Sequence, residues 1–160
     1  MFSKTLVNKK ILIYGLGLSG NSCLRYLYRK NHIKVFDDDN SLKNKKNKKF
    51  FLSKKKILKI KFDYIVLSPG IDIKKCSLKN YLSKNLDSII TELDIFYLSY
   101  PNNKKITITG TNGKSTTCQM LYNIFKLRNL DVRLVGNIGN PPLKETKIRK
   151  KTIFIIEASS

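Results

Sequence analysis

The chain has 160 residues, of which 41% are hydrophobic, and its formal net charge is +21 at pH 7. Hydrophobic residues are spread along the whole sequence, which excludes wholesale disorder and allows one folded domain, or one domain and part of another. The charge excess is almost all lysine, whereas nucleic-acid sites usually combine arginine and aromatic residues in a defined patch. We therefore do not expect nucleic-acid binding to be the main function.

Strand and helix patterns alternate along the chain. Short apolar runs predict strands at Lys10–Tyr14, Ile33–Phe36, Tyr64–Leu67, Ser88–Ile90, Lys105–Thr109, Val132–Val135 and Thr152–Ile156. Helical spacing predicts helices at Ser19–Lys30, Lys74–Asn85, Thr91–Leu98 and Gly113–Leu127. This alternation is typical of an α/β fold in which helices wrap a parallel sheet.

The first predicted strand leads into the sequence YGLGLSG, residues 14–20. Its glycines at 15, 17 and 20 have the G-x-G-x-x-G spacing of a dinucleotide-binding turn, and the acid Asp37 follows 22 residues after Gly15. This spacing alone leaves the ligand open, with NAD as one candidate. Two lysines before the apolar run are also typical of a signal peptide, but the glycines and the lack of a small-x-small cleavage site favour a buried strand.

A lysine-rich segment, residues 43–61, separates the second and third predicted strands and contains ten lysines and no acid. It is either a phosphate-binding surface or a solvated connection. We favour the connection, with Phe50, Phe51 and Leu52 packing onto the sheet.

The sequence YPNN at residues 100–103 predicts a linker, because it is rich in turn residues and the alternation of strands and helices restarts after it. We therefore predict a first domain over residues 1–99 and the beginning of a second over residues 104–160. The second is expected to be incomplete, because it stops just after its last predicted strand.

The three cysteines, Cys23, Cys76 and Cys118, are far apart, and His32 is the one histidine of the sequence. These spacings do not favour a zinc site, and free thiols suit a reducing compartment. No apolar stretch approaches the roughly 20 residues of a membrane span, so we expect a soluble, cytoplasmic protein.

The strongest functional signal is ITITGTNGKSTT, residues 106–117, in which a predicted strand leads through a glycine loop into a helix. Glycines 110 and 113 let backbone N–H groups turn toward phosphate oxygens. Lys114 adds a positive charge, and the Ser115 hydroxyl can ligate Mg²⁺. The loop departs from the usual P-loop at Ile108, where a glycine is normally found five residues before the second glycine.

This loop resembles the ATP site of the Mur ligase family. Further blocks resemble the D-glutamate-adding members of that family in the same order: GLGLSGNS (15–22), LSPGI (67–71), TELDIF (91–96), TGTNGKST (109–116), GNIGNPPL (136–143) and IEASS (156–160). The resemblance implies a Rossmann-like N-terminal domain that holds a UDP-muramoyl substrate, followed by the start of a P-loop ATPase central domain. It further implies a cytoplasmic, monomeric enzyme of peptidoglycan synthesis.

The activity implied by the resemblance is ATP-dependent addition of D-glutamate to UDP-N-acetylmuramoyl-L-alanine through an acyl phosphate, with ATP and Mg²⁺ as cofactors. Lys114 and Glu157 are the implied catalytic residues, and Ser115 and Glu157 are the implied Mg²⁺ ligands. The implied nucleotide-binding residues are Gly110, Thr111, Asn112, Gly113, Lys114, Ser115 and Thr116. The implied substrate-binding residues are Leu18, Ser19, Asp37, Asp38, Gly70, Asn137, Ser159 and Ser160.

The resemblance places a carbamylated lysine, a histidine ligand and a D-glutamate domain after residue 160. We therefore expect these 160 residues to be a truncated or fragmentary form that does not complete the ligation alone. The alternatives are another Mur-type or folylpolyglutamate ligase, a basic nucleic-acid-binding protein and, from the glycine turn alone, an NAD-binding regulator.

Overall fold

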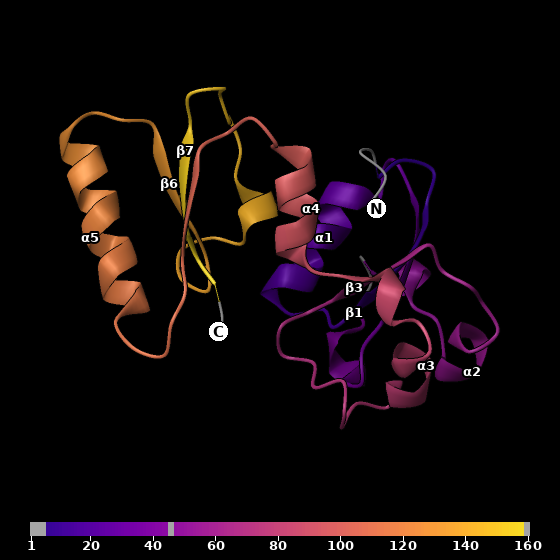
Figure 1. The fold of residues 1–160 in the computed structure, drawn as a ribbon. Coiled ribbons are helices and arrows are strands. Elements are labelled where there is room, and N and C mark those ends of the chain that lie inside the picture. The colour runs from indigo at the N-terminus through magenta and orange to yellow at the C-terminus, as the bar shows by residue number, and fades with distance from the viewer. Residues whose placement is uncertain (1–5, 45–46, 159–160) are drawn as a thin grey trace. The chain divides into compact units, whose positions relative to one another are not determined.

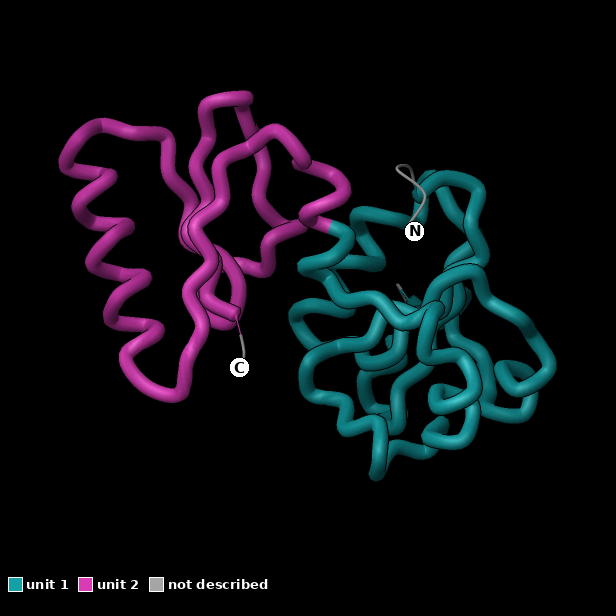
Figure 2. Tube along the Cα trace, viewed as in Figure 1, with its two compact units in different colours: residues 1–95 teal, residues 96–160 magenta. Residues whose placement is uncertain are grey.

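The computed structural model describes residues 6–44 and 47–158, which form two compact units, residues 1–95 and 96–160 (Figure 2). The division lies inside helix α4 (Glu92–Ser99). Residues 101–103 form a turn, and their role as a linker between domains stays a prediction. No described helix is both long and apolar enough to cross a membrane.

The first unit contains a four-stranded parallel sheet in the order β2-β1-β3-β4. The strands are β1 (Lys10–Tyr14), β2 (His32–Phe36), β3 (Tyr64–Leu67) and β4 (Ile89–Ile90). Residues 11–14 of β1 are fully buried, because a central strand of a parallel sheet is covered on both faces. The chain passes from β1 to β2 on one side and then to β3 on the other. The strand order therefore reverses beside β1, where doubly wound folds place their ligands.

Helices cover both faces of this sheet. Helix α1 (Leu18–Leu27) packs its buried stripe, Cys23, Leu24 and Leu27, on one face, and α2 (Lys54–Ile57) and α3 (Lys79–Ser83) lie on the other (Figure 1). On that second face, alternate strand residues such as Leu12 and Tyr14 join a core with the helix residues Ile57 and Leu82. The connection between β2 and β3 also contains the short 3-10 helices η1 (Asn40–Leu42) and η2 (Lys48–Phe50), and the stretch before α4 contains η3 (Leu86–Ser88).

The helix predicted over Lys74–Asn85 is much shorter in the structure, because its first half folds as turns. The Asp72 side chain accepts a hydrogen bond from the Lys74 N–H at 2.9 Å, and the Asp72 carbonyl accepts one from the Cys76 N–H at 2.9 Å. Aspartate favours such local turns over helix continuation.

The second unit contains a three-stranded parallel sheet in the order β5-β7-β6, with the expected connection between β6 and β7 forming the 3-10 helix η4 (Pro142–Lys144). The strands are β5 (Lys105–Ile108), β6 (Val132–Gly136) and β7 (Ile153–Glu157). Helix α5 (Lys114–Leu127) lies along one face, where Cys118 packs with Leu121 and Phe125 against the sheet, as their spacing predicts (Figure 1).

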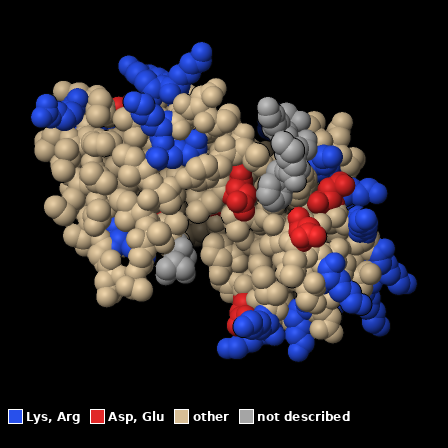
Figure 3. Space-filling view, viewed as in Figure 1, with Lys and Arg blue, Asp and Glu red and all other residues tan. Residues whose placement is uncertain are grey.

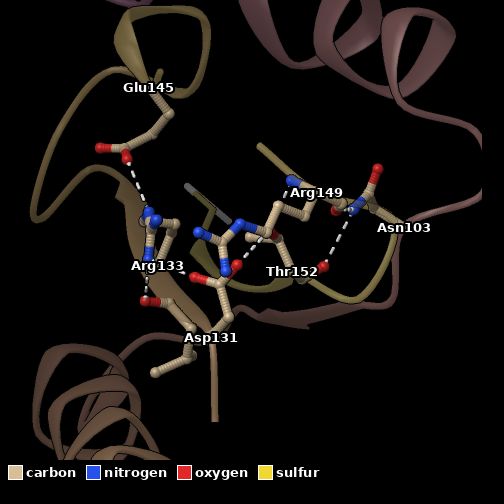
Figure 4. Close-up of polar contacts among 7 residues, drawn as sticks. Asn103, Asp131, Arg133, Glu145, Arg149 and Thr152 are labelled. Atoms are coloured by element: carbon tan, nitrogen blue, oxygen red, sulfur yellow. Dashed lines mark hydrogen bonds and ion pairs between the residues drawn. The ribbon is translucent and has the colours of Figure 1, made fainter. Parts of the chain in front are cut away.

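A polar network links the segments that precede the strands of the second unit (Figure 4). Arg133 donates to Asp131 at 2.7 Å and to Glu145 at 3.3 Å, and the Thr152 hydroxyl donates to Asp131 at 2.6 Å. The Asn103 amide donates to the carbonyl of Thr152 at 3.0 Å, which connects the turn before β5 to the start of β7. The amino ends of the strands are thereby cross-linked, and the opposite, carboxyl ends carry the candidate site.

Candidate functional site

The glycine turn of the first unit lies at the point where the strand order reverses, and the SPG block after β3 packs against it. The Ser68 hydroxyl is buried and donates to the Gly15 carbonyl at 2.8 Å, while the Ser68 N–H donates to the Tyr14 carbonyl at 3.0 Å. The two motifs that are 53 residues apart in sequence therefore form one structure at the carboxyl ends of β1 and β3. Gly70, predicted to contact substrate, is exposed beside this contact.

The three glycines of the turn meet different surroundings. A Cβ atom on Gly20 would lie 1.8 Å from the Gly15 carbonyl oxygen, and Gly15, with φ of +93°, has Ser68 Cβ 2.7 Å from the place of its own Cβ. Both glycines are required by the fold itself. A Cβ atom on Gly17 would meet nothing within 4 Å, and the next residue, Leu18, is 82% exposed. Gly17 and Leu18 therefore face open space in which a ligand can approach the backbone.

Asp37 and Asp38, both predicted to bind substrate, have different roles in the structure. The Asp37 carboxylate accepts the N–H of Leu16 in the glycine turn at 2.6 Å and also lines a surface pocket at the carboxyl end of β2. The Asp38 carboxylate instead accepts the phenol of Tyr14. Burial alone would raise the pKa of Asp38, but hydrogen bonds from Ser77 and Tyr14 outweigh it and hold that pKa below its usual value.

Ser19 donates its hydroxyl to the buried carboxylate of Glu92. This bond connects the start of α1 with the start of α4. The hydroxyl proton of Ser19 is therefore donated to Glu92 of the same unit. Sequence reasoning missed this bond and the Tyr14–Asp38 bond, because both join residues from distant elements. The acid of the TELDIF block was visible in the sequence, but nothing in the pattern indicated its partner.

The loop between β5 and α5 has the shape expected of a phosphate-binding turn. Gly113, which immediately precedes the helix, has φ of +74°, and Gly110 has φ of +140°, so both glycines adopt backbone conformations that other residues rarely take. The Lys114 amine donates to the Gly110 carbonyl and lies 3.4 Å from that of Thr111. Asn112, Ser115 and Thr116 are exposed around this turn at the helix N-terminus.

Glu157 ends the central strand of the second sheet, directly beside the strand that leads into this loop. It pairs with Ile108 of β5 and Gly136 of β6, and its carbonyl accepts the N–H of Asn137 at 3.0 Å. Ile153 and Ile155 of β7 pack in one cluster with Cys118 of α5, so the alternation along the strand places the Glu157 side chain on the same face as that helix. Burial and the Glu157 charge together raise the pKa of the Cys118 thiol. Lys114, Ser115, Asn137 and Glu157 thus gather at one edge of the sheet.

The Glu157 side chain has the character of a metal ligand. It is 5% exposed, and among the described residues its Oε2 atom is buried without a hydrogen-bond partner. A buried carboxylate oxygen without a partner is costly unless it binds a cation or water. Together with the Ser115 hydroxyl at the start of α5, this oxygen fits the oxygen ligands that Mg²⁺ prefers. Ser159 and Ser160, predicted to contact substrate, lie outside the described residues.

Comparison with known proteins identifies the family. Residues 9–90 match the model of the Mur ligase MurD-like N-terminal domain, and residues 108–160 match that of the Mur ligase middle domain. The chain belongs to the Mur ligase family.

Curated relatives of this Mur ligase chain are named UDP-N-acetylmuramoylalanine–D-glutamate ligase. That of Buchnera aphidicola subsp. Schizaphis graminum is 38% identical over 158 residues, which are 95% of this chain and 35% of the relative. That of Francisella philomiragia is 38% identical over 168 residues, covering 100% of this chain and 37% of the relative. The chain spans about a third of the length of these relatives.

A solved structure agrees with the fold of this Mur ligase chain. The UDP-N-acetylmuramate:L-alanyl-gamma-D-glutamyl-meso-diaminopimelate ligase from Neisseria meningitides matches with a TM-score of 0.52 over 95% of this chain and 53% of that protein, at 14% identity. This likeness confirms the predicted α/β fold, and the two family models confirm the predicted family.

Proposed function

We propose that this chain supplies the substrate-binding and nucleotide-binding parts of a cytoplasmic, monomeric ligase that adds D-glutamate to UDP-N-acetylmuramoyl-L-alanine. The names of its relatives support this substrate. The observation that carries the chemistry is the gathering of Lys114, Ser115 and the partly unpaired Glu157 carboxylate at one sheet edge.

In this proposal the first unit holds the uridine nucleotide, and the second unit holds ATP. Backbone N–H groups of residues 110–113 and the N-terminus of α5 face the phosphates, and the Lys114 amine moves from the loop carbonyls to the outer phosphate oxygens. Ser115 and Glu157 would hold Mg²⁺, which neutralises charge on the transferring phosphoryl group.

The reason for using ATP is chemical, because a carboxylate does not react with an amine until one of its oxygens becomes a good leaving group. The substrate carboxylate attacks the terminal phosphorus of ATP and releases ADP. The amine of D-glutamate then attacks the acyl carbon, and the collapse of the tetrahedral intermediate forms the amide and expels phosphate. Asn137 lies at the sheet edge where the acyl group would be oriented.

Titration calorimetry with ATP and Mg²⁺ tests the nucleotide site. We expect Lys114→Ala to weaken ATP binding at least about tenfold, since it removes a charge that meets phosphate. Lys126→Ala, at the other end of the same helix, is the matched control and should bind ATP normally. Glu157→Gln should reduce the gain in affinity that Mg²⁺ gives. Equal ATP affinity in Lys114→Ala and Lys126→Ala would contradict the assignment.

A further inference from the structure

A basic pocket lies at the amino ends of the strands of the second unit, at the opposite edge of the sheet from the phosphate-binding loop. Its volume is about 370 Å³, and its charged lining residues are Asp131, Arg133, Lys147, Arg149 and Lys151. The five residues of β7 separate the two edges, which at the rise of a parallel strand is roughly 17 Å. The basic pocket is therefore a different place from the proposed nucleotide site.

The acids at this pocket are already bonded within the fold. Asp131 accepts Arg133 at 2.7 Å and the Thr152 hydroxyl at 2.6 Å, and Glu145 accepts Arg133 at 3.3 Å (Figure 4). Hydrogen bonding from Thr152 and the charges of Arg133 and Arg149 lower the pKa of the Asp131 carboxyl. Arg149 thus lies near this carboxylate, but among the described residues it forms no ion pair of its own.

Three cations at the pocket therefore lack an anionic partner. Lys147, Arg149 and Lys151 alternate along the loop before β7, and all three are exposed and form no ion pair with a residue that the structure describes. Lys150 belongs to the same loop but does not line the pocket. Like charges that line one concave surface repel each other and raise the local concentration of small anions.

The backbone of Lys147 gives independent support for a binding role. Its φ is +56°, in the left-handed region that lysine rarely adopts and that glycine or asparagine adopts at lower cost. Asn129, which also lines the pocket, has φ of +55°, but it follows the C-cap of α5, where a left-handed asparagine commonly ends a helix. A lysine held in a strained conformation beside a pocket is typical of a ligand site.

The nearby end of α5 does not account for the three cations. Cations often lie near a helix C-terminus because its last carbonyl groups are unpaired. Here the Phe125 carbonyl accepts the Leu130 N–H at 3.0 Å, and the Lys126 carbonyl accepts the Asn129 N–H at 2.9 Å. Since backbone groups already bond these carbonyls, the side chains of the loop remain available to an anion.

The size and lining of the basic pocket favour a small compound with adjacent phosphate groups. The Arg149 guanidinium can donate two parallel hydrogen bonds to one phosphate, and the lysine ammonium groups bind phosphate oxygens as point charges. None of the described residues that line the pocket is aromatic, so none would stack on a nucleotide base. A volume of about 370 Å³ is also at the lower end of the range for small-molecule sites.

We propose that the basic pocket is a further anion site, in which Lys147, Arg149 and Lys151 bind a diphosphate group without a base. The bound anion would cancel the repulsion among the three cations and hold the loop before β7 near the end of α5. This site is separate from the proposed nucleotide sites and does not depend on the ligase function.

An NMR titration of the isotope-labelled full chain with inorganic pyrophosphate tests the proposal residue by residue. We expect the amide signals of residues 147–151 to shift and saturate, separately from any response of the phosphate-binding loop. Arg149→Gln and Lys147→Asn should each weaken this binding about five- to tenfold and leave the response of the loop unchanged. Asparagine tolerates the left-handed backbone, so Lys147→Asn should fold normally. Lys150→Gln is the matched control and should change the affinity less than about twofold.

The outcomes distinguish a built site from general attraction to a basic surface. Equal pyrophosphate affinity at residues 147–151 in Arg149→Gln and Lys150→Gln would overturn the proposal, as would an equal response to the same concentration of sulfate. Shifts of these signals at lower concentrations of a DNA duplex than of pyrophosphate would assign the three cations to a nucleic-acid surface and contradict the proposal. A chain that bound pyrophosphate at residues 147–151 but neither ATP nor UDP would support this site while counting against the proposed function.

Discussion

At the scale of single residues, the three glycines of the glycine turn have different roles. Two of them are required for packing within the fold, and the third leaves the backbone accessible to a ligand. Gly15 and Gly20 allow backbone and Ser68 to approach closely, so a side chain at either position collides with the fold. Gly17 has ordinary φ of −62° and an open side, so its lack of a side chain serves no packing purpose. A glycine that the fold does not require is best explained by a ligand that approaches the backbone.

This difference predicts opposite results for two alanine substitutions. Gly20→Ala should lower the free energy of unfolding by about 2 kcal/mol or more, because its methyl group would overlap the Gly15 carbonyl. Gly17→Ala should cost less than about 1 kcal/mol but weaken UDP binding about tenfold. Urea unfolding and calorimetric titration of both variants measure these effects. Normal UDP affinity in a stably folded Gly17→Ala variant would contradict the role given to this glycine.

Sequence reasoning could propose site residues that are contiguous in the chain, but it missed the hydrogen bonds that depend on tertiary contacts. The phosphate loop is contiguous, so its glycines and Lys114 could be read together with the strand and helix that flank it. The Tyr14–Asp38 and Ser19–Glu92 bonds depend on which elements become neighbours in the fold.

At the scale of elements, strands were easier to predict than short helices. Buried parallel strands are uninterrupted apolar runs, and β1 and β3 have the predicted bounds. Helix α5 begins one residue after the predicted start because Gly113 forms its N-cap. The short helices of the lysine-rich segment have too few residues to show a period, and packing decides their existence.

The polar network around Asp131 predicts a pH-dependent contribution to the stability of the second unit. Hydrogen bonding from Thr152 and the charge of Arg133 outweigh desolvation and hold the Asp131 pKa below its ordinary value of 3.8. A carboxyl with a lowered pKa in the folded state stabilises the fold above the unfolded-state pKa, and this contribution is lost as the pH falls through the folded-state pKa. Asp131→Asn should therefore destabilise the unit by about 1–2 kcal/mol at pH 7 and by much less below about pH 3.

Scanning calorimetry at pH 7 and at about pH 3 checks this prediction. The exposed Asp87, for which the structure shows no comparable network, provides the control variant Asp87→Asn, which should match the unmodified chain at pH 7. If Asp131→Asn lost equal stability at both pH values, the effect would come from packing rather than from the charge.

At the scale of the whole molecule, the net charge of +21 has to be reconciled with the proposed function, in which the ligands are small nucleotides. Lysine and arginine side chains are scattered over the visible face of each unit rather than gathered in one stripe (Figure 3). Dispersed lysine charges attract nucleic acids independently of their sequence. The affinity of such binding falls steeply as the salt concentration rises. Binding to nucleic acid and binding to nucleotide should therefore respond differently to ionic strength and to substitution.

We expect the chain to bind a duplex of about 20 base pairs in about 50 mM salt and to lose most of that affinity by about 200 mM. Lys114→Ala should leave duplex binding almost unchanged, because it removes one of many dispersed charges, while ATP binding should weaken at least about tenfold. Fluorescence anisotropy with a labelled duplex, run beside nucleotide titrations at both salt concentrations, measures the two responses. Tight duplex binding that persisted at the higher salt concentration, in a chain that bound neither ATP nor UDP, would favour a nucleic-acid-binding function over the ligase. Since Lys114 begins the helix that follows the proposed phosphate-binding loop, Lys114→Ala distinguishes nucleotide binding from duplex binding in a single protein sample.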